Sequence, residues 1–336
     1  MLEHGGRLRR AAQRYGIALE QWLDLSTGVN PTSWCGIDVP RSAWARLPED
    51  DDGLIAAAQR YFGVPHVLPV AGSQAAIMHL PQLRAPGTVG VLAPSYAEHA
   101  LRWREAGHEV APLALADCPS AADLLDVLVL VNPNNPTGER IAHAQLIEWH
   151  ARLAARGGWL IVDEAFADAN PENSIVSCSQ REGLIVLRSL GKFFGLAGAR
   201  VGFVLADKGF LELLKERMGP WTIAGPARFI AQHALADRPW QSAMRARLHA
   251  QCARLTALLQ RCGLPSAGGC SLFQWVPTPA AAAIHEALAR QGILTRLFEA
   301  PSGLRFGLPA DDAEWARLER ALGAYQETRS WPRAHS

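Results

Sequence analysis

The chain lacks any concentration of charge of one sign. Its 336 residues carry 33 lysines and arginines against 32 aspartates and glutamates, and no basic or acidic block stands out. Nucleic acid and anionic membranes are therefore poor candidates for the main partner. Although 49% of the residues are hydrophobic, no apolar run approaches the ~20 residues of a membrane span. Residues 1–10 also lack the apolar core of a signal peptide, so we expect a soluble cytoplasmic protein.

Motifs for metals, disulfides and nucleotides are also absent. The six cysteines are scattered without a C-x-x-C pair, which predicts free thiols in a reducing compartment. The eleven histidines show no H-E-x-x-H or similar spacing, so we expect no metal site. Neither the dinucleotide-binding G-x-G-x-x-G pattern nor the P-loop pattern is found.

What the sequence does contain is a regular alternation of strand and helix patterns. Continuous apolar strands between helices are typical of a mainly parallel sheet that is covered by helices on both faces. We therefore predict an α/β fold. The expected strands are 67–70, 88–92, 109–113, 126–131, 159–162, 183–187 and 201–206, and the expected helices include 53–62, 73–80, 96–105, 142–155 and 207–217.

Polar residues follow directly after three of these strands. The segment 132–138 reads N-P-N-N-P-T-G, Asp163 and Glu164 follow the next strand, and Lys192 lies beyond the third. Each cluster alone has an ordinary explanation as a turn, a helix-capping acid or a surface lysine. Because parallel sheets bind ligands at the carboxyl ends of their strands, the three clusters together predict one shared site.

The surroundings of Lys192 favour a chemical role for its amine. Small and aromatic residues flank it in the segment 189–200, and burial disfavours the charged form of a lysine. A desolvated, uncharged amine is what a Schiff-base lysine requires. Upstream, small residues at 71–76 precede a helix expected to begin at Ser73, and free amides at such a start attract phosphate.

The character of the chain changes after Asp207. Helices are expected at 227–236 and 240–261, followed by a strand at 271–276, a helix at 280–291, short strands near 293–297 and 303–306, and a helix from Asp311. This order predicts a smaller α+β domain. We expect an N-terminal arm (1–35) that packs with a small domain (226–330), and a large domain (36–225) that binds the cofactor.

Short motifs occur in a characteristic order along the chain. They are A-G-S-Q-A (71–75), P-S-Y (94–96), N-P-N-N-P-T-G (132–138), D-E-A-F (163–166), S-L-G-K (189–192), R-V-G-F (200–203) and G-L-R-F-G (303–307). The set resembles the fold-type I pyridoxal-phosphate enzymes of the aspartate aminotransferase superfamily. The chain is similar to the branch that holds histidinol-phosphate aminotransferases and threonine-phosphate decarboxylases. H-G-G (4–6), D-L-S-T-G-V-N-P (24–31) and D-E-A-F look most like the decarboxylases, which serve cobalamin side-chain synthesis.

The resemblance implies pyridoxal 5'-phosphate as cofactor and a role for each residue that contacts it. Lys192 would join the cofactor aldehyde covalently, and Asp163 would pair with the protonated ring nitrogen. Asn135 would hydrogen-bond the ring hydroxyl, and Tyr96 would stack on the ring. These four are the candidate catalytic residues. The cofactor phosphate would be held by the backbone amides of Ser73 and Gln74, the Ser189 hydroxyl and the Arg200 guanidinium.

The resemblance also implies residues that bind the substrate. Arg305 matches the family's carboxylate-binding arginine, whose planar fork suits that anion. Arg296 is a candidate second arginine. His4, Gly5 and Asn30 match positions with which the decarboxylases hold a phosphorylated substrate, and Asn135 is a further candidate. For Arg296 and the residues of the arm, the alternative is an ordinary solvated surface group.

Three positions depart from the pattern of many relatives. Gly191 stands where serine or threonine usually precedes the lysine, which removes one phosphate contact. Phe166 replaces the tyrosine of the aminotransferases, as in the decarboxylase branch. Leu47 replaces a tyrosine that in many relatives reaches the cofactor of the neighbouring subunit.

The resemblance implies decarboxylation of L-threonine O-3-phosphate to (R)-1-amino-2-propanol O-2-phosphate by a homodimer. One alternative is an aminotransferase for histidinol phosphate or a related amino acid. A second is a non-catalytic binding or regulatory protein on the same scaffold, although Lys192, Asp163, Asn135 and Arg305 are all retained.

Overall fold

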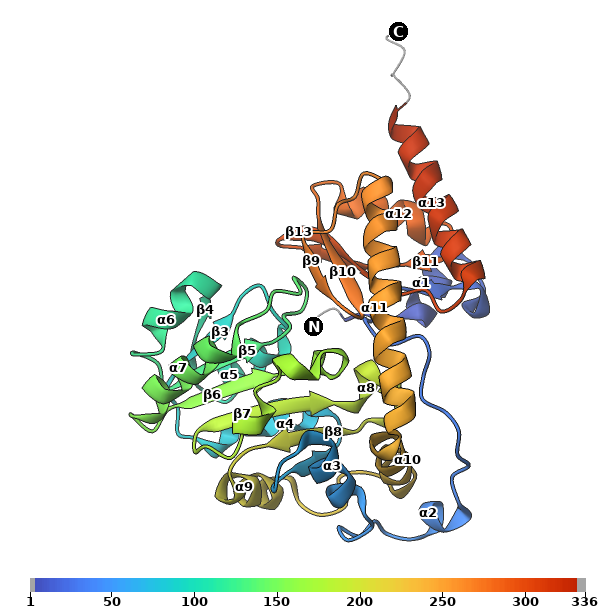
Figure 1. Ribbon diagram of the computed structural model, residues 1–336. Coiled ribbons are helices and arrows are strands. Elements are labelled where there is room, and N and C mark those ends of the chain that lie inside the picture. The colour runs from blue at the N-terminus through green and yellow to red at the C-terminus, as the bar shows by residue number, and fades with distance from the viewer. Residues whose placement is uncertain (1–3, 331–336) are drawn as a thin grey trace. The chain divides into compact units, whose positions relative to one another are not determined.

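The computed structural model describes residues 4–330, which form two compact units (Figure 1). The large unit comprises Ser33–Asn135 and Glu139–Arg245. The small unit comprises the described parts of Met1–Thr32 and Ala246–Ser336 together with Pro136–Gly138. The boundary after Arg245 lies within helix α11 (Arg238–Arg261).

The large unit is built on a mixed seven-stranded sheet with the order β2-β8-β7-β6-β5-β3-β4. Strands β7, β6, β5, β3 and β4 run parallel, and β8 is antiparallel to both of its neighbours. The predicted α/β fold with a mainly parallel sheet is thereby confirmed. The strands are β2 (Leu68–Val70), β3 (Thr88–Leu92), β4 (Glu109–Leu113), β5 (Val127–Val131), β6 (Trp159–Asp163), β7 (Leu184–Ser189) and β8 (Gly202–Leu205).

Helices cover this sheet because parallel strands need crossover connections. Helices α4, α5 and α9 pack on one face, and α7 packs against β6 (Figure 1). The helices are α2 (Arg41–Ala45), α3 (Leu54–Phe62), α4 (Ser73–His79), α5 (Glu98–Glu105), α6 (Cys118–Ala121), α7 (His143–Ala154), α8 (Leu190–Phe193), α9 (Lys208–Met218) and α10 (Gly225–Ala236).

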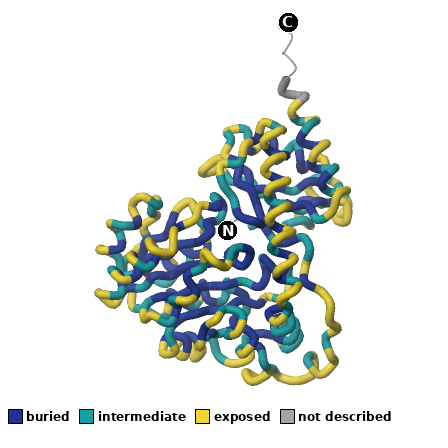
Figure 2. Tube along the Cα trace, in the orientation of Figure 1, coloured by how far each residue is buried: buried dark blue, intermediate teal, exposed yellow. Residues whose placement is uncertain are grey.

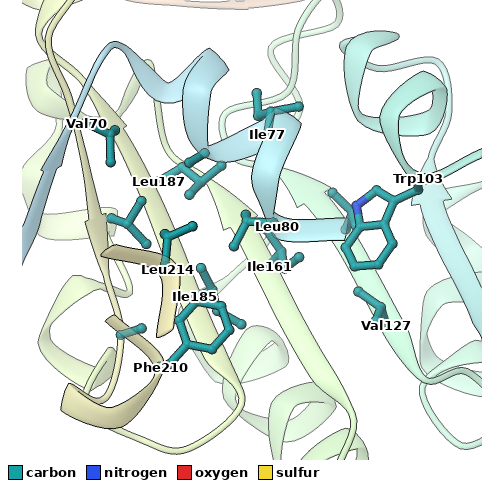
Figure 3. Packing of buried hydrophobic residues seen from close by; sticks show 14 of the residues in the cluster. Val70, Ile77, Leu80, Trp103, Val127, Ile161, Ile185, Leu187, Phe210 and Leu214 are labelled. Atoms are coloured by element: carbon teal, nitrogen blue, oxygen red, sulfur yellow. The ribbon is translucent and has the colours of Figure 1, made fainter. Parts of the chain in front are cut away.

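The core of the large unit lies between these helices and the central strands. Figure 3 shows Ile161 and Ile185 of neighbouring strands surrounded by Trp103, Phe210 and other side chains of the covering helices. Full burial of one such side chain contributes roughly 1.5–3 kcal/mol. Every residue of β5, which reads V-L-V-L-V, is buried, and the central strands accordingly appear dark blue in Figure 2. This packing fixes the strand ends that carry the polar clusters.

The small unit contains a four-stranded antiparallel sheet with the order β12-β13-β10-β9. The N-terminal arm joins this unit through β1, which pairs in parallel with β11. The strands are β1 (Leu23–Asp24), β9 (Gly268–Cys270), β10 (Phe273–Pro277), β11 (Ile293–Leu294), β12 (Arg296–Glu299) and β13 (Ser302–Gly307). The helices besides part of α11 are α1 (Leu8–Tyr15), α12 (Ala281–Ala289) and α13 (Asp312–Ser330).

Within residues 4–330, no helix has the length and apolar character needed to cross a membrane. No cluster of three metal-ligating side chains occurs among the same residues. All six cysteines are free thiols, as their spacing predicts.

Candidate active site

The large unit contains a cavity of about 160 Å³ at the carboxyl ends of β5, β6 and β7. We call it the Lys192 pocket. All eight residues that the sequence predicts to contact the cofactor line it, together with three neighbours. The lining residues are Ser73, Gln74, Tyr96, Val131, Asn135, Asp163, Ala165, Phe166, Ser189, Lys192 and Arg200. The three polar clusters at strand ends therefore meet in one place, although their chemical roles remain predictions.

Lys192 enters the pocket from a short helix that follows β7. Ser189, the last residue of β7, occupies the N-cap of α8, and its hydroxyl accepts a hydrogen bond from Gly191 N at 3.3 Å. Such a cap satisfies an amide that the first helical turn leaves open. Lys192 is half-buried, and its Nζ lies 5.2 Å from the centre of the Phe166 ring. The phenylalanine that departs from the aminotransferase pattern thus packs against the lysine.

The glycine before Lys192 has a local steric explanation. A Cβ atom at Gly191 would lie 3.1 Å from the Cα of Ala197, which is tighter than ordinary van der Waals contact. The backbone after the lysine passes too close for a larger residue without a shift. The departure at position 191 is therefore coupled to the path of the segment 195–199.

Asp163 is held by a partner that the sequence analysis missed. The Asp163 carboxylate lies at the end of β6, and its Oδ2 is 3.0 Å from His99 Nε2, with both side chains buried. Its Oδ1 accepts a hydrogen bond from Ala165 N at 3.0 Å. Two contacts of this kind orient the carboxylate and offset the cost of burying it. His99 is the second residue of α5, and its ring lies 6.1 Å from that of Tyr96, which precedes the helix.

Tyr96 and Gln74 belong to a polar chain at one wall of the pocket. The Tyr96 hydroxyl donates to Gln74 Oε1 at 3.1 Å, and Gln74 Nε2 donates to Glu98 Oε2 at 2.9 Å. Glu98 is buried and paired with Arg102 at 3.0 Å. Burial, aided by the negative charges of Glu98 and Asp163, raises the pKa of Tyr96 to about 12. Tyr96 is therefore a neutral hydroxyl at physiological pH, and Glu98 is a second residue that the motifs did not reveal.

The part of the pocket at the start of α4 is suited to an anion. Helix α4 begins at Ser73, as predicted, but Gly72 occupies the N-cap position with φ +72°. A Cβ atom at Gly72 would lie 2.6 Å from Arg200 Nη2, so the glycine admits the guanidinium beside the helix start. Arg200 itself adopts a left-handed conformation with φ 54°, which is uncommon for an arginine. Free amides and a guanidinium at one place favour a phosphate group.

The small unit contains a separate cavity of about 400 Å³, which we call the basic cavity. His4, Gly5 and Arg296, all predicted from the resemblance, line it. The sequence analysis did not include four further basic residues of the lining, because isolated arginines on a helix carry no motif. These are Arg7, Arg10 and Arg14 around α1 and His285 on α12. Two carboxylates, Glu286 and Glu299, also line the cavity, so its arginines outnumber its acids.

The arm is fixed beside this cavity by contacts of its backbone. A Cβ atom at Gly5 would lie 2.3 Å from the carbonyl oxygen of Ser26, so only glycine fits there. Gly6 N donates to the Ser26 hydroxyl at 2.8 Å, and that hydroxyl donates to Asp24 at 2.6 Å. Asn30 is buried in the same unit, where its side-chain oxygen accepts a hydrogen bond from Thr32 N at 2.9 Å. Asn30 does not belong to the lining of the basic cavity.

Arg305 is buried on β13, opposite Arg296 in the register of β12 and β13. Its Nη2 donates to the carbonyl oxygen of Ser26 at 2.6 Å, and its guanidinium lies 5.1 Å from the centre of the Phe273 ring. Burial lowers the pKa of Arg305 to about 10, and the neighbouring Arg296 cation acts in the same direction. Arg305 thus remains charged at neutral pH, as a ligand for an anion must.

Comparison with known proteins places this geometry in a family. The chain is 58% identical to a threonine-phosphate decarboxylase of Pseudomonas aeruginosa over 97% of this chain and 99% of that protein. It is 44% identical to a threonine-phosphate decarboxylase of a Sinorhizobium species over 95% and 97% of the two chains. The solved structure of a histidinol-phosphate aminotransferase from Clostridium acetobutylicum superimposes with a TM-score of 0.82 and 21% identity, covering 91% of this chain and 99% of that one.

The family description agrees with both the sequence motifs and the sheet topology. Residues 48–322, which include the Lys192 pocket and Arg305, match the family of class I and II aminotransferases. The resemblance stated from the motifs is thereby confirmed. The chain belongs to the aminotransferase class I and II family.

Proposed function

We infer that the chain is a pyridoxal-phosphate-dependent enzyme that decarboxylates threonine phosphate. The observation that carries this conclusion is the 58% identity to a threonine-phosphate decarboxylase over 97% of the chain. The fold alone does not separate decarboxylation from transamination, because it is shared with a histidinol-phosphate aminotransferase at 21% identity. The substrate is L-threonine O-3-phosphate and the product (R)-1-amino-2-propanol O-2-phosphate, a precursor in cobalamin synthesis.

The residues of the Lys192 pocket fit pyridoxal 5'-phosphate. The pocket offers an amine at Lys192, a buried carboxylate at Asp163 and anion-binding groups near Arg200. An aldehyde, a protonatable ring nitrogen and a phosphate on one small molecule call for these three kinds of group. Asn135 and Tyr96 would contact the ring hydroxyl and the ring face. When bound, the cofactor supplies an electron sink for the pair released as the Cα–carboxylate bond breaks.

The chain's own groups would then act on the substrate as follows. His99 and the Ala165 amide hold the Asp163 carboxylate in one orientation, and the carboxylate would pair with the ring nitrogen of the bound cofactor. Lys192 Nζ is the candidate to deliver the proton that replaces carbon dioxide at the substrate Cα. Neutral Tyr96 adds no charge to the pocket. Phe166 packs on the lysine and limits water beside it.

Residues of the small unit would bind the ends of the substrate. Arg305, charged and buried, is suited to a carboxylate. His4, Gly5 and Arg296 line a cavity whose arginines suit a phosphate. Asn30 and Asn135 complete the proposed substrate-binding set. Binding the phosphate far from Cα would use remote binding energy to choose which bond is broken.

The decisive experiment is a product assay with the purified protein and pyridoxal phosphate. We expect carbon dioxide and aminopropanol phosphate from threonine phosphate without any 2-oxoacid. Transfer of the amino group from histidinol phosphate to a 2-oxoacid, with no carbon dioxide from threonine phosphate, would support the aminotransferase alternative. Borohydride reduction should fix the cofactor on Lys192, and Lys192→Ala should abolish that label. Absence of the label in the unmodified protein would refute the proposed site.

We also propose that two copies of the chain form a homodimer. Trp44, Leu47 and Trp221 are 70%, 65% and 61% exposed, which is unusual for such large apolar side chains. The segments that carry them lie together, because a Cβ atom at Gly225 would lie 2.3 Å from the carbonyl oxygen of Ala43. An apolar surface of this kind favours association with another protein surface.

A further inference from the structure

Behind the Lys192 pocket lies a buried network of charged side chains, of which only Glu164 belongs to one of the motifs. Arg188 of β7 donates from Nη1 to Glu164 Oε2 at 2.8 Å and to Ser174 Oγ at 3.1 Å, and from Nη2 to Asp168 Oδ1. Glu164, Asp168 and Arg188 are 0%, 2% and 3% exposed. One guanidinium thus joins two carboxylates from the loop that follows β6. We call these four residues the Arg188 network.

The network is attached to the pocket through the backbone of two adjacent strand ends. Glu164 directly follows Asp163, and Arg188 directly precedes Ser189. Asp163 is paired with Leu187 in the register of β6 and β7, and Glu164 N donates to Leu187 O at 2.9 Å. Because successive side chains of a strand point to opposite faces, Arg188 is directed away from the face that carries Leu187 and Ser189. The pocket residues and the network therefore occupy opposite sides of the same backbone.

The network also reaches the residues after Lys192. The Tyr61 hydroxyl donates to Asp168 Oδ1 at 2.9 Å, and the Tyr61 ring lies 5.8 Å from that of Phe194. Arg245 Nε donates to Asp168 O at 2.9 Å, and its guanidinium lies 5.3 Å from the centre of the Phe193 ring. Phe193 and Phe194, the two residues that follow Lys192, thus contact groups bound to Asp168. The network is therefore connected to the chain on both sides of Lys192: to Ser189 before it and to Phe193 and Phe194 after it.

Burying these charges is costly unless they are well paired. Burial raises the pKa of Glu164, which the Arg188 cation opposes, and the two carboxylates raise the pKa of Arg188 against the effect of its own burial. Only the planar fork of an arginine can reach both acids at once, so a lysine of equal charge cannot replace it. A paired network that is attached to the ends of both strands is suited to fixing the geometry of the pocket.

We propose that the Arg188 network positions Asp163 and Lys192 for the cofactor. By joining Glu164 and Asp168 to β7, the network holds the end of β6 and the start of α8 in a fixed position relative to each other. Arg188 is a positioning residue, since it acts through Asp163, Ser189 and Lys192. The proposal rests on the cofactor site proposed above.

The test compares Arg188→Lys with a matched control, Arg228→Lys. Arg228 is also buried in the large unit, and it donates to both oxygens of Asp52 and to Glu49 O at 3.0 Å. Both substitutions keep the charge and lose the fork. We expect similar losses of melting temperature. Arg188→Lys alone should raise the dissociation constant of pyridoxal phosphate by about tenfold, as measured by titration of the apoprotein. It should also lower kcat by about tenfold and leave KM unchanged, because a small misplacement of catalytic groups slows the reaction strongly.

Ser174→Ala removes the hydroxyl that contacts both Arg188 and Glu164 with little change in volume. This variant should also weaken cofactor binding and lower kcat, but by less than Arg188→Lys does. If Arg188→Lys does not fold, Ser174→Ala serves as the test of the proposal. Cofactor affinity and kcat that match the control within about twofold in both variants would overturn the proposal. Borohydride labelling of Lys192 in the unmodified protein separates this outcome from failure of the cofactor site itself.

Discussion

The orientation of the Asp163 carboxylate depends on His99, a residue that belongs to none of the sequence motifs. The motif D-E-A-F identified the carboxylate, but the 3.0 Å contact with His99 arises because α5 packs on the sheet that contains β6. A histidine three residues after Tyr96 is unremarkable in the sequence, and only the folded chain shows where its ring points. The same holds for Glu98, which orders Gln74.

His99→Phe should weaken cofactor binding by removing one of the two contacts of the Asp163 carboxylate. Losing a hydrogen bond to a buried charged group costs about 1.5–3 kcal/mol, so affinity for pyridoxal phosphate should fall by at least tenfold. Titration of the apoprotein followed by absorbance measures it.

The matched control for this prediction is His108→Phe. His108 is also buried and bonds the carbonyl oxygen of Pro81 at 2.9 Å, but it does not line the Lys192 pocket. The His108→Phe variant should be less stable than the unmodified protein but should bind pyridoxal phosphate with the same affinity. Equal affinities in the two variants would contradict a role for His99 at Asp163.

At the scale of elements, the amino ends of β3 and β5 are joined by one carboxylate. Asp126 Oδ2 accepts hydrogen bonds from Thr88 N at 2.8 Å and from the Thr88 hydroxyl at 2.9 Å. The bond from the Thr88 backbone is the main cause that lowers the pKa of Asp126 below 3.8, against the effect of burial. This carboxylate holds two neighbouring strands of the sheet at the end opposite to the pocket.

The sign of the resulting pH dependence follows from the lowered pKa. The stabilisation is fully present above the unfolded pKa of about 3.8 and is lost as the pH falls through the lower pKa of the folded state. Asp126→Asn should therefore lower stability near neutral pH and lose less stability on acidification below about pH 5. Urea unfolding at a series of pH values measures both effects. An acid slope equal to that of the unmodified protein would show that Asp126 does not contribute.

At the scale of the whole molecule, the proposed dimer predicts a defined response to surface charge. Leu47→Glu combined with Trp221→Glu should convert the protein to monomer, because carboxylates at an apolar interface would be buried without partners. Size-exclusion chromatography with light scattering measures the mass.

The control for the dimer prediction is Leu213→Glu, which changes another apolar side chain of the large unit that is 57% exposed. This variant should leave the mass unchanged. A native protein that is fully active as a monomer would refute the dimer.

The predicted domain boundaries after residues 35 and 225 stay a prediction. The contacts within the chain instead divide the two units after Arg245.

Much of the fold follows from local pattern. The strands at 88–92 and 109–113 both have the predicted bounds. The first is a buried apolar run between helices, which is typical of a parallel strand, whereas the second is a largely exposed strand at the edge of the sheet. The strand β9 was missed because its residues Gly268 and Gly269 lack strand propensity. It exists through pairing with β10, a contact that depends on the folded chain.

The order of short motifs along the chain was enough to predict the family and its chemistry, because residue identities can be read without knowing the fold. The sequence by itself also determined the α/β class, since hydrophobic periodicity is a local property. Tertiary structure decided what holds those groups: His99 at Asp163, the Arg188 network behind Lys192, and the arginines of α1 around the basic cavity. The reason is that hydrogen bonds and ion pairs join residues far apart in the chain, and only packing fixes which of them meet.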